Sequence, residues 1–348
     1  MISTASKKKH FYLIFIAALL LSACGKHKKV DVSNISVELN IERFDHDFDQ
    51  LRGHTDSKHA DVLLKKYGQF YRDFIERVLG AGSTADTSYL ATLKKVFAAQ
   101  SYLDLKHAVD SVYPNLDKQQ AELVDAFKYI KYYFPKKQLP KVYAYFSGFQ
   151  AQTAIGNGYV GIGLDLFLGA DSKFYPALIQ AYPHYIARHF TPENMVPRVV
   201  EGMAREDMFP ESDQDESFLQ KMIYNGKVMY FMDQILPDAP DTLKIGYTAQ
   251  QLKWSENFQP QIWGYFLENN LLYSTERDRI MKYFTEAPFT NGLGEKNDSS
   301  PKLGTWIGWQ IVRQYMDRHP EVTLQQLMAD ADAQKMLNES KYRPKAEK

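Results

Sequence analysis

The only cysteine in this chain, Cys24, stands at the end of an N-terminal signal pattern and restricts what the chain can become. A basic patch at residues 7–10 precedes an apolar run at 11–21, and Ser22 and Ala23 then lead to the cysteine. This order is typical of a lipobox, in which the cysteine is lipidated and becomes the new N-terminus after cleavage. The apolar run is shorter than the ~20 residues that span a membrane as a helix. We therefore predict a signal peptide at 1–23 and a lipid, including palmitate, on Cys24.

A lone cysteine also excludes an intramolecular disulfide, a cysteine-rich zinc site and an iron–sulfur cluster. Cleavage before Cys24 removes three lysines and no acidic residue, so the formal net charge changes from 0 to about −3. This balance, without a long basic block, argues against a nucleic-acid partner. We interpret residues 24–29 as a lipidated, solvated tether, although Lys26, Lys28 and Lys29 would also suit contact with anionic headgroups.

Hydrophobic periodicity predicts one helix-rich domain over residues 30–340. Residues 30–45 alternate in part, which indicates a half-buried strand. Helical spacing begins at Ala60 and predicts one long amphipathic helix over 60–78, ended by Gly80 and Gly82. Further helices are expected at 89–99, 105–113, 118–134, 193–208, 216–236, 260–273, 276–284, 305–317 and 331–337.

Two strand-like runs, 142–146 and 159–164, lie on either side of Gly156-Asn157-Gly158 and predict a β-hairpin. The aromatic content of 14% supplies enough apolar area for one large core. The expected fold class is therefore α+β, a helix-rich single domain with a small β-sheet or hairpin. A charged C-terminal tail at 341–348 should fray.

No catalytic constellation is visible in the sequence. Gly156, Gly158 and Gly161 have the spacing of a dinucleotide fingerprint, but Gly161 lies inside a strand pattern where that fingerprint needs a helix. His184 and His189 are five residues apart, which turns a helix by about 500° and leaves their rings about 140° apart, too far to share a metal. A P-loop, a His-Glu-x-x-His motif and a nucleophile elbow are also missing. We predict no catalytic residue, no metal and no cofactor.

A cluster of acidic residues and a cluster of tryptophans and other apolar residues are both interpreted as structural features. The acidic residues at 211–216 lack the central glycine and the distal glutamate of a calcium loop, and so indicate a solvated helix start. Trp306 and Trp309 belong to an apolar segment whose density indicates a buried core helix. A sugar-stacking or partner-binding surface is the alternative for these tryptophans.

A series of stretches occurs in one order along the mature chain. They include Ile41-Glu42-Arg43-Phe44-Asp45, Trp306-Ile307-Gly308-Trp309 and residues 30–35, 161–175, 222–230, 245–254, 262–266, 271–275 and 340–344. Together they resemble the gliding motility lipoprotein B (GldB) family of Bacteroidetes. The resemblance implies a role in surface gliding alongside the type IX secretion and motility machinery, but it names no biochemical activity.

This family is in turn similar, more distantly, to zinc peptidases that carry a His-Glu-x-x-His helix and a later Glu-Gly segment. Here the helix expected at 193–208 has no histidine. Asn225 stands before Gly226, where an acidic third ligand would be sought. We therefore interpret the scaffold as a degenerate, metallopeptidase-like one that has lost metal and catalysis.

Three functions remain open at this point. The first is a non-catalytic, lipid-anchored envelope protein that docks on protein components of the gliding or secretion machinery. The second is an envelope hydrolase, such as a divergent metal-dependent peptidase, with a site around His184, His189 and Glu201. The third is a module that binds glycan or peptidoglycan through Trp254 and Trp263.

The residues after Cys24 bear on localisation. Gly25 follows Cys24 where an aspartate would signal inner-membrane retention in better-known bacteria, which favours the outer membrane over the inner. No acidic run follows the cysteine, so we expect the domain to lie in the periplasm.

Overall fold

A computed structural model describes residues 29–294 and 298–345 of the chain. The predicted signal peptide and Cys24 lie outside these described residues. The chain divides into two compact units, residues 1–34 and 35–348. All the helices and strands named below belong to the second unit.

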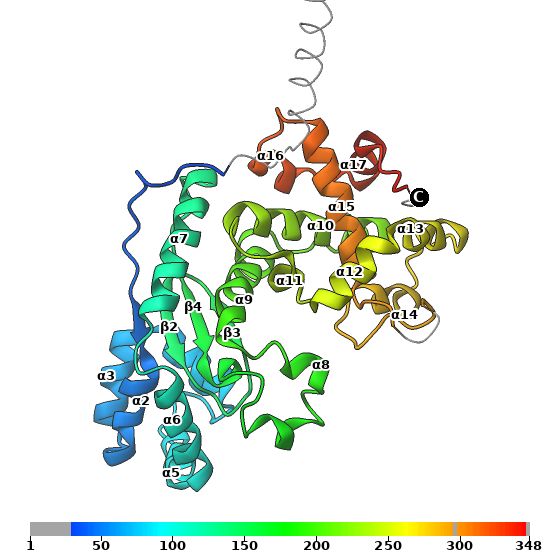
Figure 1. Cartoon of the computed structure of the whole chain (residues 1–348). Coiled ribbons are helices and arrows are strands. Elements are labelled where there is room, and N and C mark those ends of the chain that lie inside the picture. Colours follow the sequence, from blue (N-terminus) through cyan, green and yellow to red (C-terminus); the bar gives the residue numbers. More distant parts are fainter. Residues whose placement is uncertain (1–28, 295–297, 346–348) are drawn as a thin grey trace, which may run out of the picture. The chain divides into compact units, whose positions relative to one another are not determined.

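Helices make up most of the second unit, and one small sheet lies among them (Figure 1). The elements up to the last strand are β1 (Ile41–Arg43), α2 (Phe44–Gln50), η2 (Leu51–Gly53), α3 (Ser57–Tyr67), α4 (Gln69–Asp73), η3 (Phe74–Val78), α5 (Tyr89–Ala98), α6 (Gln100–Val112), α7 (Asp117–Tyr133), β2 (Lys141–Tyr145), β3 (Thr153–Gly156) and β4 (Tyr159–Gly163). The later elements are η4 (Leu164–Phe167), η5 (Tyr175–Leu178), α8 (His184–Ala187), η6 (Pro192–Asn194), α9 (Met195–Gly202), η7 (Met203–Met208), α10 (Phe218–Ile235), α11 (Asp241–Ile245), α12 (Ala249–Asn257), α13 (Gln259–Glu268), α14 (Arg277–Ile280), η8 (Met281–Tyr283), α15 (Leu303–Arg318), α16 (Leu324–Ala329) and α17 (Ala333–Ser340). The predicted fold class, helix-rich α+β with a small sheet, is confirmed.

The four strands form one mixed sheet in the order β1-β2-β4-β3. β2 pairs in parallel with both β1 and β4, and β3 runs antiparallel to β4. The turn of the predicted hairpin is confirmed, but the strand predicted to precede it is wrong. The turn at Asn157 and Gly158 joins β3 to β4, whereas the run at 142–146 is the parallel neighbour β2. A parallel pair requires a longer connection, and the short strand β3, which has no strong pattern of its own, lies within that connection.

The strand predicted over 30–45 forms a hydrogen-bonded ladder only at β1. The odd-numbered residues from 35 to 39 are half-buried and the even-numbered residues from 36 to 40 are exposed, so the predicted sidedness is correct. Pairing is confined to Ile41–Arg43, and α2 begins at Phe44. Alternation reports which side of an extended segment is covered, and it does not report whether a partner strand is present.

The single helix predicted over 60–78 is broken in the structure. α3 ends at Tyr67, Gly68 adopts a positive φ of 56°, and α4 and the π-helical turn η3 continue from Gln69. Glycine reaches this conformation without the steric cost that a β-carbon would bring. The break turns Phe70 and Phe74 onto the sheet, where Phe70 packs against Tyr143 with ring centroids 4.7 Å apart.

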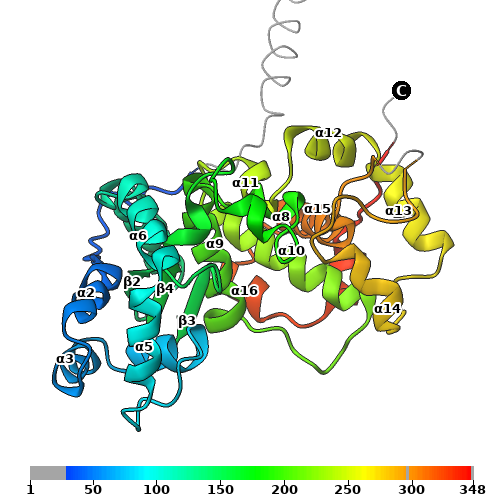
Figure 2. The same ribbon diagram turned by 90° about the horizontal axis from the view of Figure 1, so that it is seen from below.

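The helices predicted from 89 to 134 and from 193 onward are confirmed, with shifted ends. α10 and α15 are the buried centre of the second unit, and α9 and α10 lie between the sheet and the C-terminal helices (Figures 1 and 2). Trp306 and Trp309 of α15 are only 2% and 0% exposed, which confirms the core interpretation of these tryptophans. Residues 211–216 are all exposed before α10, and Ser217 caps that helix.

α10 and α15 cross at two glycines. A β-carbon added to Gly226 would overlap the Gly308 carbonyl and would lie 2.9 Å from the backbone nitrogen of Trp309. A β-carbon added to Gly308 would overlap the carbonyl oxygen of Met222. The two helix backbones are therefore in direct contact, an approach that only glycine permits.

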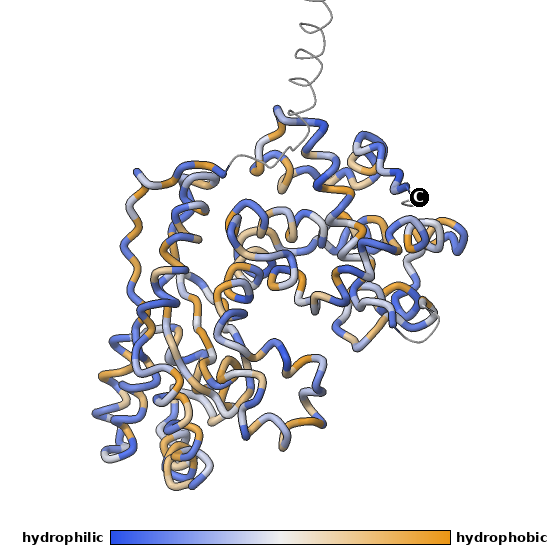
Figure 3. The backbone as a smooth tube through the Cα atoms, in the orientation of Figure 1, coloured by the Kyte–Doolittle hydropathy of each residue, from blue (hydrophilic) through white to orange (hydrophobic). Residues whose placement is uncertain are grey.

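Hydropathy changes over short distances along the helices, as the colouring of the chain in Figure 3 shows. Within the described ranges, no helix is both long enough and apolar enough to cross a membrane.

Asp165, directly after β4, is a fully buried carboxyl that should make stability depend on pH. Its Oδ2 accepts the backbone N–H groups of Ser147 at 3.0 Å and Phe149 at 2.6 Å, while Oδ1 has no partner among the described residues. Burial raises the pKa of Asp165 from 3.8 to about 6, although these N–H donors oppose the shift. A raised folded-state pKa adds stability that is complete below about pH 4 and is lost as the pH rises through about 6.

Replacing Asp165 with asparagine should remove this pH dependence, because the amide keeps one oxygen for the two N–H groups and does not ionise. We expect the wild-type protein to lose stability relative to Asp165→Asn as the pH rises from 4 to 7. Urea unfolding of both proteins across this range measures the difference, in which all other titrating groups cancel. A difference that stays constant with pH would contradict the prediction.

Candidate functional site

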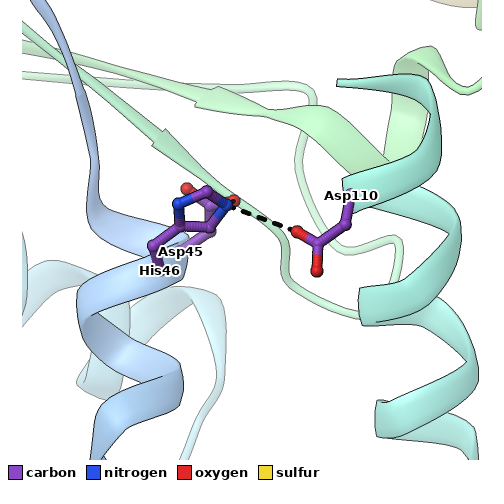
Figure 4. Close-up of side chains that lie close together, drawn as sticks. All are labelled: Asp45, His46 and Asp110. Carbon is purple, nitrogen blue, oxygen red and sulfur yellow. Dashed lines mark ion pairs between the residues drawn. The ribbon is translucent and has the colours of Figure 1, made fainter. Parts of the chain in front are cut away.

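Asp45, His46 and Asp110 form the tightest group of metal-ligand side chains among the described residues, with ligand atoms within 4.8 Å of one another (Figure 4). His46 Nε2 lies 3.3 Å from Asp110 on α6 and 3.7 Å from Asp45. Both carboxylates already have cationic partners, because Arg43 binds Asp45 at 2.7 Å and Lys106 binds Asp110 at 2.5 Å. The group is therefore an ion-pair network that joins α2 to α6.

A second group of charged side chains surrounds a pocket of about 360 Å³ between α9, α10 and the segments that lead into α12 and α15. We call it the charged pocket. The cations of its lining are Arg198, Arg205, Lys221, Lys244 and Lys302. The carboxylates of its lining are Glu201, Glu211 and Glu286. Its apolar lining residues are Met229, Ile245, Met281 and Phe284, and Asn225 and Thr305 complete the lining.

Glu201 lies between two arginines of its own helical segment. Helical spacing places residues three and four apart on one face, so Arg198 reaches Glu201 at 2.5 Å and Arg205 reaches it at 2.9 Å. Burial alone would raise the pKa of Glu201, but Arg198, Arg205 and Lys302 outweigh it and lower the pKa to about 2. Glu201 is thus held as a carboxylate under all ordinary conditions.

Arg205 links α9 to α10. Its Nη2 donates to Asn225 Oδ1 at 3.0 Å while its Nε is bound to Glu201. The Asn225 amide in turn donates to the Lys221 carbonyl at 2.8 Å. The comparison with peptidases drew attention to the helix that contains Glu201 and, separately, to Asn225. The guanidinium group of Arg205 joins these two positions.

Lys302 closes the other side of the charged pocket. Its ammonium group donates to the Ile245 carbonyl and to Glu286. Burial lowers the pKa of Lys302, and the carboxylate of Glu286 acts in the opposite direction. His189 Nε2 lies 4.0 Å from Glu286, and burial beside Arg188, Lys302 and Arg198 lowers its pKa to about 3. His189 is therefore a neutral imidazole at neutral pH.

Lys244 belongs to a separate cluster directly behind the pocket. Its Nζ lies 2.8 Å from Asp233 and 3.6 Å from Asp241. Arg313 binds both of these carboxylates, and its guanidinium stacks on the Trp309 ring at 3.8 Å. This cluster holds two cations and two carboxylates, so it is neutral overall.

The hydrolase site suggested around His184, His189 and Glu201 is only partly assembled. His189 and Glu201 face the same cations, Arg198 and Lys302. His184 is exposed on α8, and no contact joins it to this group in the described structure. The sequence analysis did not identify Arg198, Arg205 or Lys302, and the only signal for them was the spacing of the two arginines around Glu201.

The two tryptophans suggested for glycan binding have different surroundings. Trp254 lines a pocket of about 390 Å³ together with Phe258, and the two ring centroids are 4.9 Å apart. Gln261 and Asp298 supply polar groups there. Trp263 instead packs edge-on against Tyr342, with centroids 5.4 Å apart. Trp254 therefore lies at a pocket, and Trp263 lies against a tyrosine ring.

The described residues define a helix-rich α+β protein with a charged pocket between α9, α10 and the segments that lead into α12 and α15. A protein-family model described as gliding motility protein GldB matches residues 25–344. The chain belongs to this family, which confirms the resemblance noted in the sequence and associates the chain with gliding motility. No curated protein and no solved structure matches it.

Proposed function

We propose that this protein is a lipoprotein of the cell envelope, anchored through Cys24, that supports gliding motility by binding protein components of the gliding or type IX secretion machinery. Its folded domain lies in the periplasm at the outer membrane, and it catalyses no reaction. Family membership supports the link to gliding motility. The lipid anchor rests on the signal pattern that ends at Cys24.

The state of Glu201 is the observation that carries the non-catalytic part of the proposal. A general base works best when its pKa lies near the working pH. Glu201 has a pKa near 2 and two arginine partners, so it is a poor proton acceptor. Among the described residues, the carboxylate paired with His189 is that of Glu286, and it lies 4.0 Å away, beyond hydrogen-bonding distance. The His189 pKa of about 3 leaves the ring unable to hold a proton for transfer near pH 7.

The same surroundings disfavour a metal ion. Arg198, Arg205 and Lys302 place positive charge around the Glu201 carboxylate, and like charges at close range repel strongly where water is excluded. Asn225, which stands where an acidic ligand was sought, is already bonded to Arg205 and to the Lys221 carbonyl. These contacts support a scaffold in which ion pairs take the place of a reaction centre.

A comparison of the wild-type protein with Cys24→Ala tests the anchor and the docking role together. We expect the wild type in the membrane fraction and Cys24→Ala in the soluble fraction, because loss of the thiol removes the attachment point of the lipid. Cross-linking in native membranes, pull-down and mass spectrometry should recover envelope machinery proteins with the wild type and fewer with Cys24→Ala.

Two outcomes would contradict the proposal. If the anchored wild-type protein recovers no specific partner, the docking role loses its support. If the purified protein carries stoichiometric, tightly bound zinc, the non-catalytic assignment is wrong and a divergent peptidase replaces it.

Glycan binding is a second candidate, favoured by the pocket at Trp254 and Phe258. Flat aromatic faces with nearby polar groups are suited to a sugar ring, which has an apolar face and hydroxyls at its edge. Retention of the protein on cell-wall material, lost in Trp254→Ala and kept in Trp263→Ala, would favour this function over protein docking.

A further inference from the structure

The charged pocket has one positive charge in excess. Lys244 is neutralised by the cluster behind the pocket, in which two cations face two carboxylates. Lys221 pairs with Glu211 at 3.3 Å, and Lys302 pairs with Glu286. Only Glu201 remains, and it faces two arginines. Arg198 and Arg205 therefore share one carboxylate, which leaves one positive charge without a carboxylate of its own.

The donors of Arg198 are also incompletely used. Arg198 directs Nη2 to the carbonyls of Leu243 and Lys244, at 3.1 and 2.7 Å, and Nη1 to Glu201. Its Nε is buried and has no hydrogen-bond partner among the described residues. A buried donor without a partner costs free energy unless a ligand or water accepts from it. The carbonyl contacts hold Arg198 in place, so its geometry is set in advance.

The lining of the pocket also includes apolar side chains. These side chains are Met229 of α10, Ile245, Met281 and Phe284. The volume of about 360 Å³ falls at the small end of the range for ligand sites in proteins. A small lining that holds both charged and apolar side chains suits a small group that is itself amphipathic.

We propose that the charged pocket binds a carboxylate attached to an apolar group, such as the C-terminus or an acidic side chain of a peptide next to a hydrophobic residue. Arg205 and Arg198 bind the carboxylate, and Met229, Met281 and Phe284 contact the apolar part. Guanidinium groups match the planar geometry of a carboxylate. This inference does not depend on the docking role, since an enzyme would use the same contacts to hold a ligand.

The charge balance favours a carboxylate over a phosphate. A single excess positive charge is neutralised by one monoanion, whereas a phosphate dianion would leave the pocket negative. Three carboxylates already lie in the lining, and like charge near a buried dianion is unfavourable. Inorganic phosphate is therefore a discriminating probe.

The first test titrates the full-length protein in detergent with acetyl-Ala-Ala-Leu, which has a free C-terminal carboxylate, and with its C-terminal amide. We expect the carboxylate form to bind at least tenfold more tightly, since a charge-assisted hydrogen bond contributes about 1.5–3 kcal/mol. Acetyl-Ala-Glu-Leu-amide tests a side-chain carboxylate, and N-acetyl-leucine tests a free small molecule. The tightest of these three identifies the source of the carboxylate.

Two variants should shift the affinity in opposite directions. Arg205→Met removes a donor and should weaken carboxylate binding about tenfold. Glu201→Gln frees both arginines from their internal partner and should tighten binding several-fold. Arg198→Met, which removes the other proposed donor, is for use if Arg205→Met does not fold. Arg77→Met is the matched control, because Arg77 is 81% exposed on η3 and lies outside the pocket.

Four results would overturn the proposal. Equal binding of the carboxylate and the amide, or no binding at about millimolar concentration, would show that the pocket does not recognise a carboxylate. Tighter binding of inorganic phosphate would reject the carboxylate assignment. Weaker binding in Glu201→Gln, in a protein whose thermal unfolding shows that it is folded, would show that the arginines serve only to hold α9 against α10.

Discussion

Replacing Gly308 with alanine should destabilise the protein by about 3 kcal/mol or more, the upper part of the range for overpacked cores. The added methyl group would overlap the Met222 carbonyl of α10, which is backbone and cannot rotate away. α10 and α15 must then separate, and this separation would loosen packing along both buried helices. Denaturant unfolding followed by circular dichroism measures the loss.

Gly264→Ala is the matched control for this prediction. Gly264 lies inside α13, and a β-carbon there would have nothing within 4 Å. Alanine has a higher helix propensity than glycine by about 1 kcal/mol, so Gly264→Ala should be neutral or stabilising. If Gly308→Ala is as stable as Gly264→Ala, the result would contradict the direct backbone contact between α10 and α15.

Replacing Asp233 with alanine should have a comparable effect, about 3–5 kcal/mol. Its carboxylate accepts four hydrogen bonds, two from Arg313 and one each from Lys244 and Trp309, all at 2.8 Å. Without it, two cations share the single carboxylate of Asp241. The Lys244 side chain is only 5% exposed, so water cannot replace the lost partner.

Asp241→Ala tests whether the cost comes from buried, unpaired charge. Asp241 binds the same two cations, but its side chain is 29% exposed and that of Asp233 is 12% exposed. Because water reaches Asp241, its removal should cost about 1 kcal/mol, as for partly exposed ion pairs. Thermal unfolding of Asp233→Ala and Asp241→Ala measures the loss of stability in each variant. Equal losses would show that the burial of the carboxylate does not determine the cost of removing it.

The helices were the most predictable part of the fold. In α6, α7 and α9, apolar residues recur at helical spacing, and the structure places them in the core. α10 was also predicted, although its side chains are buried on nearly all sides. The pairing of strands was less predictable, because alternation carries no information on which strand lies next to which. β2 and β4 pair in parallel, and the connection between them contains β3, a strand of four residues whose sequence has no strong alternation.

The charged pocket could not be predicted as a site. Glu201, Arg198 and Arg205 are close in sequence, and their spacing indicates a shared helix face. Lys302 and Glu286 come from segments about one hundred residues later and reach the pocket only through tertiary folding. A search for known catalytic motifs therefore found nothing there, because the feature that distinguishes the pocket is a sum of charges contributed by distant segments.

The burial of α10 has a consequence for motion. Amide hydrogens in a helix that is covered on nearly all sides exchange with solvent only when the surrounding structure opens as a whole. Lys221 and Asn225 lie on this helix, so one wall of the charged pocket keeps its shape for as long as the unit stays folded. Lys302 and Glu286 line the same pocket from a connecting segment between η8 and α15. Any adjustment to an incoming ligand must come from that segment, with α10 as the fixed reference.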